Sequence, residues 1–103
     1  MNILTYQDWN STIDSNIQCV LVLIFTTPWC DNCDSFKSNV VKLLEQSSGK
    51  STTNLYIADI NTHTELVDKF NITTVPTTLV INRRKIVCRV SGAKIEELQK
   101  ILV

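Results

Sequence analysis

The stretch Trp29-Cys30-Asp31-Asn32-Cys33 directly follows an apolar run over residues 19–25, and it opens a segment whose apolar residues recur at helical spacing. The run is rich in β-branched residues, which is typical of a strand buried on both faces. Two cysteines three positions apart, where a strand passes into a helix, can close a short disulfide. A helix N-terminus also favours the thiolate of the first cysteine. The pattern therefore indicates a redox-active pair.

The bulk composition indicates one ordinary globular domain. With 103 residues, 44% hydrophobic and 19% charged, the chain is long enough for a single domain over residues 1–103. The formal net charge is zero, so we expect no general attraction to nucleic acid or to a membrane surface. The N-terminus lacks the features of a signal peptide, and the apolar run is shorter than the ~20 residues that span a bilayer. We therefore expect a cytoplasmic protein, in whose reducing surroundings a cysteine pair is catalytic or metal-binding rather than structural.

The hydrophobic pattern predicts the element order β-α-β-α-β-α-β-β-α. The expected strands are 3–5, 19–26, 55–61, 77–81 and 86–90. The expected helices are 6–15, 33 to about 49, a short one capped by Thr62 and Glu65, and a last one over 95–102. Crossovers between the early strands imply parallel pairing, whereas the tight turn over 82–85 implies an antiparallel pair. We expect an α/β fold with a central mixed sheet flanked by helices on both faces, and Trp9 in its core.

The order resembles that of the thioredoxin family. Three features carry the resemblance: Trp-Cys-x-x-Cys at 29–33, Val75-Pro76-Thr77 before a strand, and Ser91-Gly92-Ala93 before the last helix. The resemblance spans nearly the whole chain. It implies a thioredoxin-like fold in which the Val75–Pro76 bond is cis and its loop packs against the cysteine pair.

The resemblance also implies the activity of a thiol–disulfide oxidoreductase. Cys30 would be the nucleophile that attacks a disulfide in a protein substrate, and Cys33 the resolving thiol that closes the Cys30–Cys33 disulfide. No cofactor is needed, because the electrons pass through the sulfurs. A thioredoxin reductase-like flavoprotein is the expected electron donor of what we expect to be a monomer.

The substrate-binding surface implied by the resemblance is built around the second motif. The backbone of Val75 would pair with the substrate as an added strand does. Trp29, Pro76 and Gly92 would shape the surface around it. Trp29 is thus expected at the surface rather than in the core.

Two acids depart from the family pattern next to the cysteines. Asp31, with Asn32, stands where typical thioredoxins carry Gly-Pro, and Asp34 stands where a basic residue is usual. Negative charges disfavour a nearby thiolate. We therefore expect Asp31 and Asp34 to tune the pKa of Cys30.

A third departure concerns the interior beneath the pair. The family's buried acid falls at Ile24 and its lysine partner near Ile57, and both positions are apolar here. The usual route for deprotonating Cys33 is therefore absent. Asp59 is the nearest acid in the predicted strand, but the sequence leaves open which face it occupies.

Two other functions stay open at this point. Thr74-Val75-Pro76 is also similar to glutaredoxins, which use glutathione, although the N-terminal strand and helix, the Trp before the first cysteine and the single glycine in 91–93 speak against them. The other alternative is a non-enzymatic thioredoxin-fold subunit of another protein.

The remaining candidate residues favour ordinary structural roles. Structural zinc needs four ligands, usually in two pairs, whereas Cys19, Cys88 and His63 are unpaired and lie in different elements, so no metal is expected. We expect Cys19 and Cys88 to be inert buried thiols and His63 to be solvated. The basic run 83–85 is expected to be a hairpin tip rather than a nucleic-acid contact, since no aromatic residues alternate with it.

Overall fold

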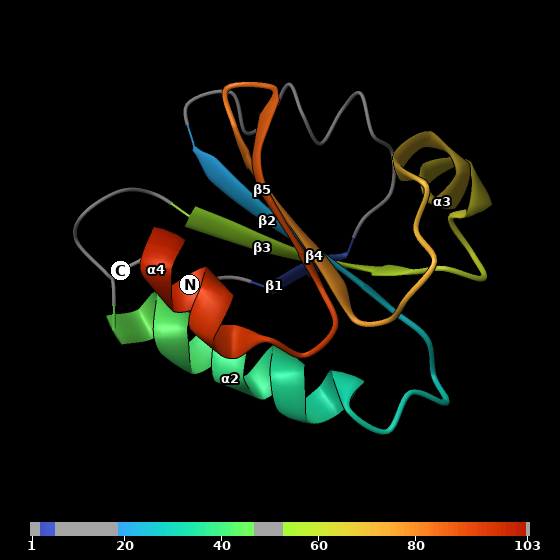
Figure 1. Cartoon of the computed structure of the whole chain (residues 1–103), viewed down its shortest axis with the longest axis horizontal. Coiled ribbons are helices and arrows are strands. Elements are labelled where there is room, and N and C mark those ends of the chain that lie inside the picture. The colour runs from blue at the N-terminus through green and yellow to red at the C-terminus, as the bar shows by residue number, and fades with distance from the viewer. Residues whose placement is uncertain (1–2, 6–18, 47–52, 103) are drawn as a thin grey trace.

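A computed structural model describes residues 3–5, 19–46 and 53–102, which form a mixed sheet covered by helices (Figure 1). The strands are β1 (Ile3–Thr5), β2 (Val20–Thr26), β3 (Thr53–Asp59), β4 (Thr77–Asn82) and β5 (Lys85–Ser91), and the helices are α2 (Cys33–Gln46), α3 (Thr64–Phe70) and α4 (Ile95–Leu102). The helix predicted over 6–15, Trp9 within it, and the predicted end of α2 near residue 49 lie outside the described residues. None of the described helices is long and apolar enough to cross a membrane.

The strand order is β1-β3-β2-β4-β5. β1 and β2 run parallel to β3, whereas β4 runs antiparallel to both β2 and β5. The predicted parallel crossovers and the antiparallel hairpin are thus confirmed. The central strand β2 is the one predicted to be buried on both faces, and its residues 21–25 are at most 1% exposed.

The two faces of the sheet carry separate cores because strand residues alternate in direction. On one face, Val22 and Ile24 of β2 join Leu55 and Ile57 of β3 beneath α2 and α4. On the other face, a second cluster packs against α3. It contains Leu21, Leu23, Phe25, Tyr56, Ala58 and Leu66. The expectation of helices on both faces is confirmed (Figure 1).

The end of β3 differs from the prediction. The strand ends at Asp59 rather than at residue 61, because Asn61 donates its backbone N–H to Asp59 Oδ1 over 2.8 Å and the chain turns there. The backbone carbonyl of Asp59 then accepts hydrogen bonds from the N–H groups of Thr62 and His63, at 3.1 and 3.0 Å. His63 is the N-cap of α3 and its side chain makes no cap hydrogen bond, so the predicted capping box of Thr62 and Glu65 is wrong.

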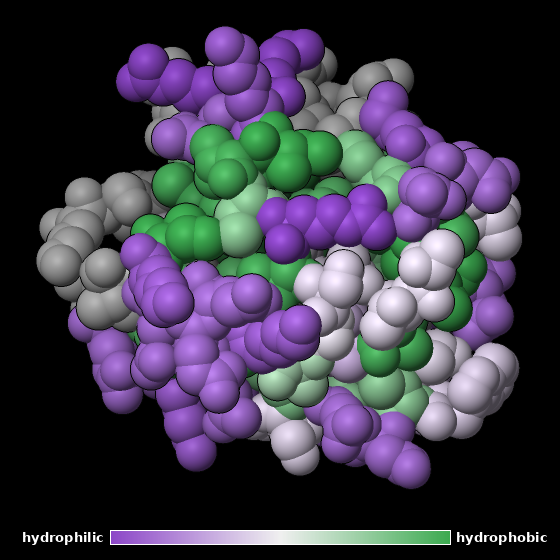
Figure 2. Space-filling model, in the orientation of Figure 1, coloured by the Kyte–Doolittle hydropathy of each residue, from purple (hydrophilic) through white to green (hydrophobic). Residues whose placement is uncertain are grey.

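The hairpin between β4 and β5 forms where the sequence predicted it. Its strands reach Asn82 and Lys85, so only Arg83 and Arg84 remain in the turn. Both arginines have positive φ, at 52° and 70°. Apolar side chains lie at the surface along β5, below the hydrophilic hairpin tip (Figure 2). Ile86 and Val87 are 47% and 55% exposed.

Candidate active site

The cysteine pair lies in the connection from β2 to α2. Cys30 donates its N–H to the carbonyl of Thr27 over 3.2 Å, and Cys33 donates its N–H to the carbonyl of Cys30 over 3.4 Å. These turns lead directly into α2, whose first residue is Cys33. Cys30 therefore lies three residues before the first residue of α2, whose predicted start at residue 33 is confirmed.

A disulfide joins the two cysteines, with an S–S distance of 2.20 Å and a Cα–Cα distance of 5.4 Å. Their exposure differs. Cys30 is partly exposed, whereas Cys33 is only 3% exposed beneath it. Cys30 is therefore the more accessible of the two cysteines.

Three loops leave the sheet at the same end and bring the predicted surface residues together. β2 ends beside the cysteine pair, and its Phe25 is in register with Thr77, the residue that follows Pro76. Thr77 is in turn in register with Ser91, which precedes Gly92. Gly92 also donates its N–H to the carbonyl of Pro76 over 2.8 Å.

The individual residues of this surface match their predicted surroundings. Trp29 is 75% exposed, so it is a surface residue and not part of the core. The Val75–Pro76 bond is cis, as the resemblance implied; Pro76 is buried and Val75 half-buried. Gly92 has a φ of +87° and open space around its Cα. The backbone conformation, and not a lack of room for a side chain, therefore favours glycine at this position.

The interior under the pair is apolar where the family carries charge. Ile24 is fully buried and is in register with Ile57 on the neighbouring strand. Both side chains pack in the core beneath α2. Asp31 and Asp34 are exposed instead.

A pocket of about 440 Å³ opens against the buried cysteine. Its wall includes Cys33, together with Thr26 from the end of β2 and Asp59 from the end of β3. Lys37 and His63 line it as well. The sequence singled out Asp59 as the nearest acid, and the structure places it in the same pocket as Cys33.

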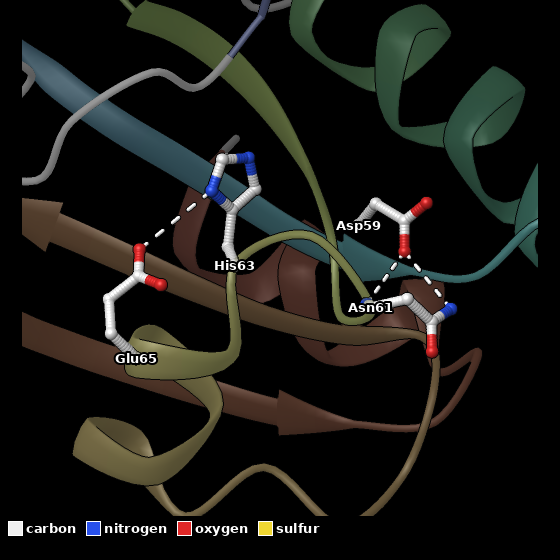
Figure 3. Close-up of polar contacts among 4 residues, drawn as sticks. All are labelled: Asp59, Asn61, His63 and Glu65. Carbon is white, nitrogen blue, oxygen red and sulfur yellow. Dashed lines mark hydrogen bonds and ion pairs between the residues drawn. The ribbon is translucent and has the colours of Figure 1, made fainter.

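The prediction that His63 is solvated is wrong. Its side chain is only 16% exposed, and its Nδ1 lies 3.8 Å from Glu65 Oε1 (Figure 3). The reason is its place in the turn after β3, which folds it back against the pocket. No pattern in the neighbouring residues signals this placement.

The other two cysteines are half-buried thiols outside the disulfide. Burial, and secondarily the charge of Glu97, raises the pKa of the Cys88 thiol. Cys88 is therefore poor in thiolate, in line with an inert role. Across residues 3–5, 19–46 and 53–102, no three His, Cys, Asp or Glu side chains gather as a metal site would require.

Comparison with known proteins agrees with this geometry. The thioredoxin family model matches residues 1–103. The chain is 22% identical over 101 residues to thioredoxin-1 of Drosophila melanogaster, covering 98% of this chain and 92% of that one. It is 27% identical over 81 residues to thioredoxin H2 of Arabidopsis thaliana, covering 79% of this chain and 59% of that relative's length.

Among solved structures, thioredoxin from Fasciola hepatica superposes with a TM-score of 0.80 at 26% identity, over 99% of this chain and 96% of that one. Thioredoxin from Trypanosoma brucei brucei has the same fold, with a TM-score of 0.82 at 19% identity, over 96% and 86% of the two chains. The chain belongs to the thioredoxin family. Within that family, its Cys30–Cys33 pair makes it a thioredoxin-type thiol–disulfide oxidoreductase.

Proposed function

We propose that this protein reduces disulfides in other proteins, with Cys30 as nucleophile and Cys33 as resolving thiol. The observation that carries the assignment is the unequal exposure of two cysteines that share one disulfide. The Cys30 thiolate attacks a substrate sulfur and forms a mixed disulfide. Cys33 then attacks Cys30, releases the second substrate thiol, and leaves the Cys30–Cys33 disulfide.

The substrate is held by the loops at this end of the sheet. Trp29 offers an exposed flat ring next to Cys30. Val75, ahead of the first residue of β4, offers backbone groups for an added strand. Pro76 and Gly92, which are joined by a hydrogen bond, complete the surface.

Electrons come from a thioredoxin reductase-like flavoprotein in this proposal, and glutathione is the alternative donor. We place the protein in the cytosol as a monomer that carries electrons between partners. In that reducing compartment, Cys19 and Cys88 stay as thiols.

The test is reduction of insulin disulfides with NADPH and thioredoxin reductase, and separately with glutathione and glutathione reductase. We expect turnover with thioredoxin reductase. Cys30→Ser should abolish it, Cys33→Ser should accumulate a mixed disulfide with the substrate, and Cys88→Ser should leave it unchanged. Turnover with glutathione alone would indicate a glutaredoxin-like enzyme. A partner complex whose function survives loss of both Cys30 and Cys33 would indicate a non-enzymatic subunit.

A further inference from the structure

The resolving thiol has to lose its proton inside the protein. Cys33 is 3% exposed, and only its thiolate attacks the mixed disulfide. Among the residues that the structure describes, the core beneath it offers no acceptor, since Ile24 and Ile57 face each other there. A proton acceptor must therefore reach Cys33 from another side.

The pocket beside Cys33 gives a proton acceptor access to this thiol. Residues two apart on a strand share a face. Leu55 and Ile57 of β3 both pack beneath α2, so Asp59, two residues further on, lies on that same face. Its partner in register is Thr26, which lines the pocket too. The half-buried carboxylate of Asp59 is thus placed toward the start of α2, where Cys33 lies.

The carboxylate of Asp59 is held in one orientation. Its Oδ1 accepts hydrogen bonds from the backbone N–H and the side-chain Nδ2 of Asn61, at 2.8 and 3.2 Å. The same Nδ2 donates to Thr27 Oγ1 over 3.1 Å, which ties the clamp to the loop that leads to the cysteines. Both bonds of Asn61 use one oxygen, and the other oxygen of Asp59 points away from Asn61 (Figure 3).

We propose that Asp59 is the proton acceptor for Cys33 in the resolving step, in place of an acid at position 24. The inference rests on the proposed function. The proton of the Cys33 thiol passes to the Asp59 carboxylate, directly or through one water in the pocket. The Cys33 thiolate then bonds to Cys30 Sγ, the bond from Cys30 to the substrate sulfur breaks, and the substrate leaves as a thiolate that takes up a proton. The two protein thiols are oxidised and the substrate disulfide is reduced.

Three other charged or titratable groups face the pocket. Asp34 and Lys37 come from the first turns of α2, and His63 comes from the turn before α3. Asp34 is exposed, whereas Asp59 is half-buried. Lys37 carries an ammonium group, which offers hydrogen-bond donors and no acceptor. His63 is the remaining candidate acceptor, but its Nδ1 lies 3.8 Å from Glu65 Oε1.

The experiment isolates the resolving step with dithiobis-nitrobenzoate as a small disulfide, in a background with Cys19→Ala and Cys88→Ala. Stopped-flow absorbance resolves two releases of thionitrobenzoate. The first depends on reagent concentration and reports attack by Cys30, whereas the second is independent of it and reports attack by Cys33. Both rates are followed from about pH 5 to about pH 9 for the parent, Asp59→Asn, Asp59→Glu, Asp34→Asn and His63→Gln. Asn retains the Oδ1 acceptor that Asn61 needs, so the loop is preserved.

We expect Asp59→Asn to slow the second release about 10–100-fold near neutral pH, and to make its rate rise more steeply with pH as bulk base takes over. The first release should change by less than about twofold, and Asp59→Glu should recover part of the second rate. Asp34→Asn should alter only the first release, through its effect on the Cys30 thiolate, and should leave the second release at the parent's rate. A second release that is unchanged in Asp59→Asn overturns the proposal, as does a loss that appears in His63→Gln instead. This measurement uses neither a protein substrate nor a reductase. A failure of the proposed function in those assays can therefore be told apart from a failure of the role proposed for Asp59.

Discussion

At the scale of single residues, two exposed acids adjoin the cysteines in the sequence. Asp31 lies between the cysteines and Asp34 directly follows Cys33. Each disfavours a thiolate at Cys30, although exposure limits the interaction of two charges 4 Å apart to about 1 kcal/mol in bulk water. A less favoured thiolate makes the reduced pair less stable and the protein a stronger reductant.

Removing both acids should therefore shift the redox balance. We expect Asp31→Asn combined with Asp34→Asn to increase the fraction of Cys30 present as thiolate at a given pH, and to make the reduction potential less negative. Thiolate absorbance against pH and a redox titration with glutathione measure the two effects. Asp68→Asn, on an exposed position of α3, is the matched control and should change neither. An unchanged potential in the double variant would contradict the assignment of Asp31 and Asp34 as tuning residues.

At the scale of elements, the turn of the hairpin between β4 and β5 has an unfavourable backbone conformation. A two-residue hairpin turn with positive φ at both positions favours Asn and Gly, since a left-handed conformation costs other residues roughly 1–2 kcal/mol. This chain has Arg83 and Arg84 there. The register of β4 with β5 imposes the conformation, because the strands pair up to Asn82 and Lys85.

Replacing the turn residues should stabilise the protein. We expect Arg83→Asn combined with Arg84→Gly to raise the free energy of unfolding by about 1 kcal/mol, measured by urea denaturation. The control Arg83→Ala with Arg84→Ala removes the same charges and keeps the unfavourable φ. If it stabilises the protein equally, repulsion between the arginines rather than backbone conformation is the cause.

At the scale of the whole molecule, one side chain connects the edge strand β5 to the C-terminal end of helix α3. The Arg89 guanidinium, on β5, donates hydrogen bonds to the carbonyl oxygens of Phe70 and Asn71, the latter over 3.0 Å. Phe70 ends α3, and Asn71 has the left-handed conformation typical of a helix C-cap. Carbonyl groups at a helix end lack partners within the helix, so Arg89 both satisfies them and holds α3 to the sheet.

Loss of this connection should weaken the fold without altering catalysis. We expect Arg89→Gln to lower the free energy of unfolding by about 1 kcal/mol in urea denaturation, while insulin reduction stays unchanged. Arg83→Gln, on the hairpin turn, removes the same charge without those hydrogen bonds and should have a smaller effect. Equal destabilisation by the two variants would show that net charge, and not the link to α3, matters.

Within the part of the chain that the structure describes, the sequence by itself determined the element order, the central strand and the cysteine pair. Each depends on residues close together in the chain: the apolar run over 19–25, the helical spacing after Cys33, and the turn at 83–84. The resemblance added the cis bond at Pro76 and the exposed Trp29, which follow from motifs of a few residues. Local patterns of this kind can be recognised without knowing which strands become neighbours.

Only the tertiary structure decided what surrounds Cys33. Alternation along β3 leaves two choices of face, and the choice for Asp59 was made when Leu55 and Ile57 packed beneath α2. His63 is half-buried because the turn after Asp59 folds back on the pocket, which no neighbouring residue signals. The pocket joins residues from β2, α2, β3 and the turn before α3, so it exists only once long-range packing has brought those elements together.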